Sequence, residues 1–256
     1  MDLSGKTILI TGAAGRIGSA TARMAFSYGA DLVLADLAEE RLTLLVSELR
    51  QAGSQKVYSF PSDITSTKGI DHLFAEIGRS LLTITSAVHC AYPTSSGWGT
   101  KFEDVQEENL YQDLQMQLGG AILFSQKILG YFLKHGGGDL VHISSVQGVQ
   151  PPKFDHYEGT HMTSPVEYAA IKSGIISITR WLSKYHANKG IRVNCVSPGG
   201  ILDKQPEVFL ERYRQSCTNI GMLHSNQVAN AIIFLLSSAS LAINGQNLIV
   251  DDGWSL

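Results

Sequence analysis

The chain has 256 residues, of which 44% are hydrophobic and 17% are charged, and its formal net charge is -3 at pH 7. This composition is typical of a globular protein and excludes a disordered or fibrous chain. Its charges are scattered, so we expect neither a nucleic acid nor an anionic membrane as a partner. The apolar runs are far shorter than the roughly 20 residues of a membrane span, and no signal-peptide pattern precedes the first strand, so we expect a cytoplasmic protein.

Short runs rich in branched apolar residues alternate with longer segments of helical periodicity. We expect strands at Thr7–Thr11, Asp31–Asp36, Lys56–Pro61, Thr85–His89, Asp139–Ile143, Arg192–Val196 and Asn247–Val250. We expect helices at 16–28, 39–52, 68–80, 103–135, 165–187 and 226–237. The alternation predicts an α/β fold of Rossmann type, in which a doubly wound parallel sheet of seven strands carries helices on both faces. No linker or repeat interrupts the pattern, so we expect residues 1–256 to form a single dinucleotide-binding domain.

Three long segments, 91–102, 147–164 and 201–222, follow the fourth, fifth and sixth predicted strands. In an open parallel sheet the carboxyl ends of the strands border the ligand crevice. Long ordered loops in such places tend to be functional. We therefore predict that these loops border a substrate site and that the third forms a lid.

The first predicted strand leads into a glycine-rich turn that opens a helix, Gly12-Ala13-Ala14-Gly15-Arg16-Ile17-Gly18. Small residues let the backbone approach a pyrophosphate, and the helix N-terminus stabilises its charge. Glycines also end strands for structural reasons, so the turn alone is weak evidence. From this turn we assign six residues to cofactor binding: Gly12, Ala14, Gly15, Arg16, Ile17 and Gly18.

The second predicted strand ends in Asp36, followed by Leu37, and we assign both to cofactor binding. A carboxylate there accepts hydrogen bonds from the adenosine ribose hydroxyls and repels a 2'-phosphate. We therefore predict NAD(H), with NADP(H) less favoured. Arg16 is the counter-evidence, since a guanidinium near the turn suits NADP, and the alternative for Asp36 is a solvated acid at a strand end.

Tyr168 and Lys172 stand four residues apart in a predicted helix and so share one face. The sequence Ser164-Pro165-Val166-Glu167 predicts the start of that helix, with Ser164 as N-cap and Glu167 closing a capping box. A neighbouring ammonium is expected to lower the pKa of the phenol. Tyr168 can then take a hydroxyl proton while hydride leaves the carbinol carbon, or donate it in reverse.

Hydrogen-bond donors beside Tyr168 are expected from Ser144 and Ser145, which follow the fifth predicted strand. No metal is expected, because the eight histidines form no HxxxH or HExxH pair. The cysteines, Cys90, Cys195 and Cys217, are too widely spaced for a disulfide framework and are expected to be small core residues.

Together with Asp63-Ile64 and Asn194-xxx-Pro198-Gly199, these motifs resemble the short-chain dehydrogenase/reductase family in its compact single-domain branch, over nearly the whole chain. The resemblance implies Tyr168 as acid/base, Lys172 as its modulator and ribose ligand, and Ser145 as donor to the substrate oxygen. It also implies further cofactor contacts along the strand ends, at Asp63, Ile64, Cys90, Ala91, Pro198, Gly199 and Ile201. Relatives form dimers or tetramers through the two long helices, so the resemblance implies a homodimer or homotetramer.

The sequence departs from the family pattern at several points. Arg16 stands where the compact branch has its middle glycine, and the resulting spacing resembles the branch that acts on nucleotide sugars. The usual Asn-Asn-Ala-Gly reads His89-Cys90-Ala91-Tyr92, which replaces a glycine beside the nicotinamide with a bulky phenol. In the family, an Asn takes part in a water relay to the lysine. Here the corresponding residue is Gln117, whose side-chain amide keeps such a relay feasible.

Ser145 and Tyr168 are 23 positions apart, more than the family spacing. The inserted segment, Gln150–Ser164, carries aromatic, acidic and basic groups, which suit a hydroxylated or phosphorylated ligand better than a lipid. We predict a polar, sugar-like substrate, with contacts from Tyr92, Lys153, His156, Tyr157 and His161. The alternative is a solvated excursion or an oligomer contact. This insertion and the C-terminal tail, Asn244–Leu256, resemble those of a bacterial subgroup associated with flagellin modification and legionaminic acid synthesis.

The sequence thus predicts an NAD(P)-dependent dehydrogenase/reductase acting on CH–OH groups. One alternative is a sugar epimerase or dehydratase that oxidises its substrate transiently, which the glycine spacing favours; against it, we expect no extra C-terminal substrate domain. Another is a catalytically silent NAD-binding sensor or scaffold, which the departure at His89 to Tyr92 suggests and the intact Ser145, Tyr168 and Lys172 oppose.

Overall fold

The computed structural model describes residues 1–80 and 82–256. Seven parallel strands form one sheet in the order β3-β2-β1-β4-β5-β6-β7. The strands are β1 (Thr7–Thr11), β2 (Asp31–Asp36), β3 (Val57–Pro61), β4 (Ser86–His89), β5 (Gly138–Ile143), β6 (Ile191–Pro198) and β7 (Asn247–Val250). The strand order reverses between β1 and β4, and ligands bind at such a switch point in doubly wound sheets. The predicted Rossmann-type fold is confirmed.

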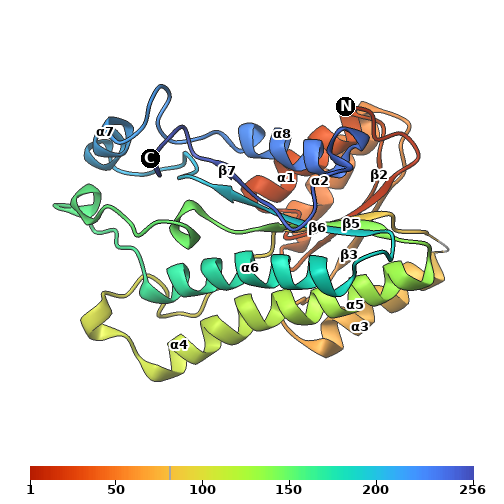
Figure 1. The fold of residues 1–256 in the computed structure, drawn as a ribbon, viewed down its shortest axis with the longest axis horizontal. Coiled ribbons are helices and arrows are strands. Elements are labelled where there is room, and N and C mark those ends of the chain that lie inside the picture. The colour runs from red at the N-terminus through yellow and green to blue at the C-terminus, as the bar shows by residue number, and fades with distance from the viewer. Residues whose placement is uncertain (81) are drawn as a thin grey trace.

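Helices cover both faces of the sheet (Figure 1). One face carries α1 (Arg16–Ser27), α2 (Glu39–Ala52) and α8 (Ser225–Leu236), and the other carries α3 (Thr67–Arg79), α5 (Gly120–Lys134) and α6 (Val166–Tyr185). Each face has its own buried core: Ile8 and Ile10 of β1 belong to one and Leu9 to the other. This follows from the alternation of side chains along a strand that is covered on both sides.

The helix predicted at 103–135 is wrong in its details. A 3-10 turn at Phe102–Asp104 comes first, and the helix begins as α4 at Glu107–Asp113. A π-helical segment, η2 (Leu114–Gly119), then joins α4 to α5. Val105 is extended and so separates the turn from the helix. Hydrophobic periodicity does not reveal a π-helical turn, which is common at functional sites.

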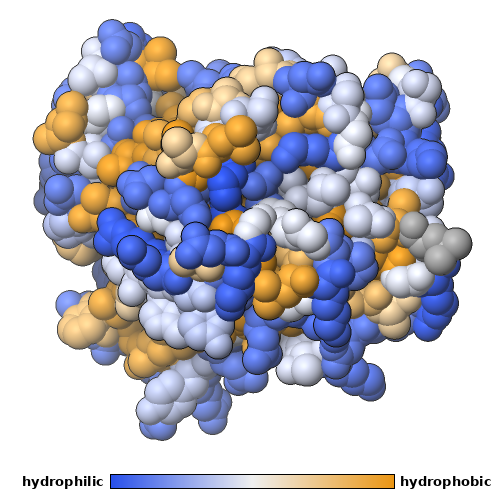
Figure 2. Space-filling model, turned by 45° about the vertical axis from the view of Figure 1, so that its right-hand side comes forward, coloured by the Kyte–Doolittle hydropathy of each residue, from blue (hydrophilic) through white to orange (hydrophobic). Residues whose placement is uncertain are grey.

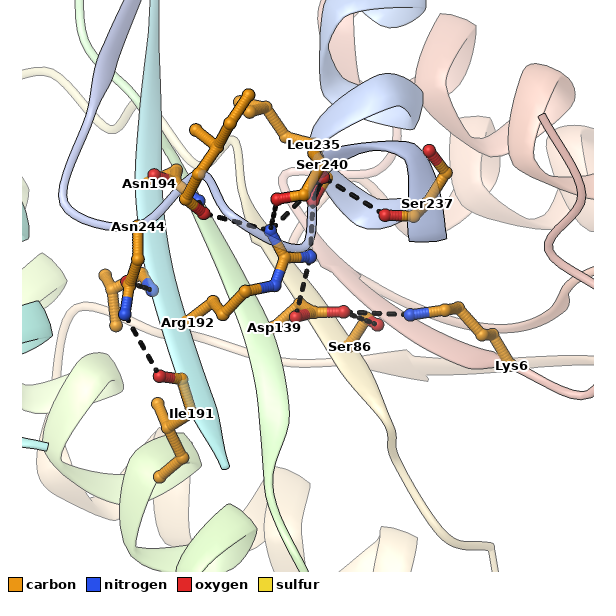
Figure 3. Close-up of polar contacts among 12 residues, drawn as sticks. Lys6, Ser86, Asp139, Ile191, Arg192, Asn194, Leu235, Ser237, Ser240 and Asn244 are labelled. Atoms are coloured by element: carbon orange, nitrogen blue, oxygen red, sulfur yellow. Dashed lines mark hydrogen bonds and ion pairs between the residues drawn. The ribbon is translucent and has the colours of Figure 1, made fainter. Parts of the chain in front are cut away.

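An ion-pair network ties the amino ends of the strands together, opposite the carboxyl ends (Figure 3). The Arg192 guanidinium forms an ion pair with Asp139 Oδ1 at 2.9 Å and donates to the Leu235 carbonyl at the end of α8 at 2.8 Å. Lys6 Nζ donates to the other oxygen of Asp139 at 2.8 Å. Since Arg192 also contacts carbonyls after α8, it joins β5 and β6 to the last turn of that helix.

The molecular face in Figure 2 is a mosaic of hydrophilic and hydrophobic residues. Among the helices in residues 1–80 and 82–256, none combines the length and the apolar character needed to cross a bilayer.

Candidate active site

A cavity of about 700 Å³ opens at the carboxyl ends of the strands. The predicted site residues that line it are Gly12, Gly15, Arg16, Ile17, Gly18, Asp36, Leu37, Asp63, Ile64, Cys90, Ala91, Tyr92, Ser145, His156, Tyr157, Tyr168, Lys172, Pro198, Gly199 and Ile201. Four predicted residues are not part of its lining: Ala14, Gln117, Lys153 and His161. The structure therefore brings the glycine turn, the strand ends and the Tyr168 helix to one site.

The glycine turn fits the diphosphate of a dinucleotide. Gly12 has φ +65°, and a Cβ on it would lie 2.6 Å from the backbone nitrogen of Ala91. A Cβ on Gly18 would collide with the Gly12 carbonyl. Helix α1 begins after Gly15 without a side-chain cap and without an acidic residue in its first turn. Its first N–H groups, which have no partner inside the helix, are therefore available to an anion.

Asp36 is held in place by the turn itself. One carboxylate oxygen accepts the Ala14 N–H and the other the Ala38 N–H, each at 2.8 Å. Ala14 thus contributes through its backbone, although it does not line the cavity. Each oxygen keeps a free lone pair for a ribose hydroxyl. The Arg16 guanidinium is paired with Asp203, in the segment that leads to α7 (Glu207–Gln215).

Tyr168 and Lys172 lie on α6, where both side chains reach the cavity. Lys172 is buried, and its Nζ donates to the Ile143 carbonyl at 3.1 Å. Nζ lies 5.5 Å from the centre of the Tyr168 ring. Ser145 Oγ accepts the Gln147 N–H at 3.2 Å, and its hydroxyl lies within hydrogen-bonding reach of Tyr168. These three residues can therefore act on one oxygen atom.

Burial dominates the proton affinities of this pair. It raises the pKa of Tyr168, although a hydrogen bond from Ser145 acts in the opposite direction. It lowers the pKa of Lys172 to about 8. The expected lowering of the Tyr168 pKa is therefore wrong for this structure, because the loss of water around the phenolate outweighs other effects.

The predicted capping box at Ser164 is also wrong. Pro165 is the N-cap of α6 and makes no side-chain cap bond. Ser164 Oγ instead donates to the side-chain oxygen of Gln147, whose Nε2 donates to the Tyr157 hydroxyl at 3.3 Å. We call Gln147, Tyr157 and Ser164 the polar cluster; all three line the cavity. Gln147 and Ser164 were not predicted as site residues, because their hydrogen-bond partners are ten or more residues away in the sequence.

The inserted segment is anchored to α7 and to the C-terminal tail, although much of it is exposed. His156 is buried, and its Nε2 lies 2.9 Å from Ser216 Oγ, just after α7. Lys153 Nζ lies 5.2 Å from the centre of the Trp254 ring, in the C-terminal tail. His161 is exposed. Lys153 and His161 thus receive no support from the cavity as substrate ligands, whereas His156 lines the cavity and also joins the insertion to the segment after α7.

Gln117 lies in η2, which packs against α6. Its amide is buried, and neither its nitrogen nor its oxygen has a hydrogen-bond partner within residues 1–80 and 82–256. A buried unpaired amide is costly, so it fits a bound water. The proton relay through Gln117 stays a prediction.

Several aromatic residues complete the wall of the cavity and were not predicted: Trp98, Phe209, Tyr213 and Trp254. Trp98 belongs to the predicted loop 91–102, and the other three join α7 to the C-terminal tail. Cys90 lines the cavity and is only partly buried, so among the cysteines just Cys195 is the core residue that was expected. Within the described residues, no three His, Cys, Asp or Glu side chains gather as a metal site.

Comparisons with known proteins agree with this geometry. A family profile described as Enoyl-(Acyl carrier protein) reductase matches residues 12–255. A post-translational flagellin modification protein A of Campylobacter coli is 38% identical over 99% of this chain and 100% of its own length. A 3-oxoacyl-(acyl-carrier-protein) reductase of Thermotoga maritima is 30% identical over 99% of each chain. Among solved structures, a short chain dehydrogenase of Leptospira borgpetersenii with bound NAD+ is 29% identical, with a TM-score of 0.86 over 100% of this chain and 94% of that one.

Proposed function

The chain belongs to the short-chain dehydrogenase/reductase family of oxidoreductases, and from this premise we propose that it transfers hydride between NAD(H) and a secondary alcohol or ketone of a polar, sugar-like substrate. The observation that carries the proposal is the meeting of Ser145, Tyr168 and Lys172 in one cavity with the glycine turn and Asp36. This combination supports chemistry at a carbon that bears an oxygen atom.

In the proposed mechanism, a bound nicotinamide would supply or take up the hydride. Ser145 donates its hydroxyl hydrogen to the substrate oxygen, while its own oxygen accepts the Gln147 N–H. Tyr168 exchanges the proton with that same oxygen through its hydroxyl. The Lys172 ammonium stabilises the phenolate form that arises when Tyr168 has donated its proton.

NAD(H) is favoured over NADP(H) by two observations. The carboxylate of Asp36 faces the cavity and repels a 2'-phosphate. Arg16, which could otherwise neutralise such a phosphate, is paired with Asp203. The diphosphate would lie at the start of α1, beside Gly15.

A sugar-like substrate is supported by the lining around Tyr168. The polar cluster offers an amide and two hydroxyls, while Tyr92, Trp98 and Trp254 offer aromatic rings. Convergent polar groups bind sugar hydroxyls, and apolar rings suit the C–H face of a sugar ring. The Campylobacter relative, named for flagellin modification, agrees with a role in carbohydrate metabolism. We assign substrate contact to the polar cluster in preference to Lys153 and His161.

We further propose a homodimer or homotetramer, one domain spanning residues 1–256 and a cytoplasmic location. The outer sides of α4, α5 and α6 expose large apolar residues, namely Tyr111, Ile122, Leu133, Val166, Trp181 and Tyr185. Such surfaces are typical of protein interfaces. The single seven-stranded sheet supports one domain, and the need for NAD(H) supports the location.

The test is a panel of hydroxylated sugars, amino sugars, sugar phosphates and their keto forms, with a 3-ketoacyl thioester as the apolar comparison. We expect NADH to accumulate with a member of the sugar group, in stoichiometric amount with product. Conversion of a sugar without NADH accumulation would favour an epimerase or dehydratase. Turnover of the thioester alone would overturn the substrate class.

A further inference from the structure

Tyr92 stands at the end of the His89-to-Tyr92 segment, directly against the reacting pair. Its ring packs edge-to-face on Tyr168, with centroids 5.8 Å apart and an interplanar angle of 82°. Trp98 packs edge-to-face on both, at 5.5 Å from Tyr92 and 5.9 Å from Tyr168. Three mutually perpendicular rings fix one another, because edge-to-face packing is a favoured aromatic geometry. The orientation of the Tyr92 ring is therefore set by its neighbours.

The face of this ring is directed at Lys172. Nζ of Lys172 lies 5.1 Å from the Tyr92 centroid, closer than the 5.5 Å to the Tyr168 centroid. A cation within about 6 Å of a ring centroid is attracted by the negative face of the π system.

Lys172 has few other partners for its charge. Its Nζ makes one hydrogen bond, to the Ile143 carbonyl, and in residues 1–80 and 82–256 it forms no ion pair with a carboxylate. Tyr92 and Tyr168 present their rings to it, and the other titratable groups close enough to interact with its charge are Cys90, Cys195, His89 and His142. An ammonium carries three donors, and burying it without compensation favours its neutral form.

We propose that Tyr92 is a positioning residue, whose ring face holds the Lys172 side chain as an ammonium beside Tyr168. The phenol thus supplies, from the loop after β4, the attraction that a carboxylate would supply elsewhere. This inference rests on the proposed function, because it gives the charge of Lys172 a catalytic purpose. It also gives a reason for a bulky ring where the family pattern has a glycine.

Tyr92 itself does not change charge in the relevant range. Partial burial raises its pKa, and the nearby Tyr168, Asp113 and Glu167 act in the same direction. The phenol therefore stays neutral while Lys172 titrates. A change in the titration of Lys172 after substitution of Tyr92 then reports on the loss of the ring.

The test follows the Lys172 side chain by NMR in protein labelled with 13C-lysine, without substrate, and assigns its signal by its absence from Lys172→Arg. Wild type is expected to titrate with a midpoint of about 8. Tyr92→Leu keeps an apolar side chain without a π face, and its midpoint should fall by about one unit, a tenfold loss of the ammonium form. Tyr92→Phe keeps the ring and should titrate like wild type.

Equal midpoints in wild type and Tyr92→Leu would overturn the proposal, as would a shift in Tyr92→Phe as large as that in Tyr92→Leu. Tyr92→Met is a second non-aromatic variant in case Tyr92→Leu does not fold, and thermal melting checks each protein. Since this titration needs no turnover, the proposal for Tyr92 is tested separately from the proposed reaction. Either of the two can be overturned while the other stands.

Discussion

The guanidinium of Arg16, in the glycine turn, forms an ion pair with the carboxylate of Asp203, in the segment leading to α7. The pair links the first βα unit to the segment before α7, and both of these segments contribute to the lining of the cavity. We therefore expect the pair to slow the release of a bound dinucleotide.

Replacing Asp203 with Ala should accelerate NADH release. Because both side chains are partly exposed, the pair is weak, and we expect a rate about two- to fivefold higher. Stopped-flow displacement of bound NADH measures this release rate. Lys204→Ala, at the next exposed position, is the control and should release NADH like wild type. An equal acceleration by Asp203→Ala in an Arg16→Ala background would show that the pair is not the cause.

Asp36→Ala should relax the preference for NAD(H), because the carboxylate that repels a 2'-phosphate is gone. The ratio of kcat/KM for NAD+ to that for NADP+ is expected to fall by about tenfold or more. Glu39→Ala removes a nearby exposed acid of α2 that does not line the cavity, and the ratio should not change. A native enzyme that already prefers NADPH would refute the cofactor assignment.

Arg192 is expected to contribute to stability and not to catalysis, since its network lies at the amino ends of the strands (Figure 3). Arg192→Met leaves carbonyls of Leu235 and Ser240 without their donor, and should lower the free energy of unfolding by about 3 to 5 kcal/mol. Urea denaturation measures this loss. Lys127→Met breaks an exposed pair with Asp71 and should cost less than about 1 kcal/mol. Equal losses in the two variants would contradict the proposed importance of the Arg192 network.

Two buried histidines predict how stability depends on pH. Burial lowers the pKa of His142 to about 4 and that of His89 well below its usual value. Between the folded and unfolded pKa values the unfolded chain binds more protons, so stability is full above about pH 6.5 and falls as the pH drops toward 4. His142 alone should account for about 3 kcal/mol of this loss.

Urea denaturation at several pH values tests this dependence. His142→Gln should flatten the slope between neutral and acidic pH, while His72→Gln, at an exposed position of α3, should keep it. An unchanged slope in His142→Gln would show that other groups govern the acid sensitivity.

The elements of the sheet were predictable because their signals are local. The branched runs of β1 and β2, the glycine turn and the spacing of Tyr168 and Lys172 can each be read within a few residues. Parallel strands meet at one edge, so the order of the motifs also implied that Asp36 and Ser145 share a cavity.

Other features depend on contacts between distant segments and were beyond the sequence. Gln147 is part of the site because Ser164 and Tyr157 fold back onto it. His156 was predicted as a substrate contact, but its anchoring by Ser216, 60 residues away, could not be predicted from the sequence. In the same way, the local sequence suggested a capping box at Ser164, but the Ser164 hydroxyl donates a hydrogen bond to the side-chain oxygen of Gln147.

The central claim is that Tyr168 carries the proton during hydride transfer, and Tyr168→Phe tests it most directly. The substitution removes a hydroxyl and keeps the ring that packs against Tyr92 and Trp98. We expect turnover to fall by at least about 100-fold while the Kd for NADH, measured by fluorescence, stays within about twofold. Turnover close to that of wild type in this variant would contradict the account.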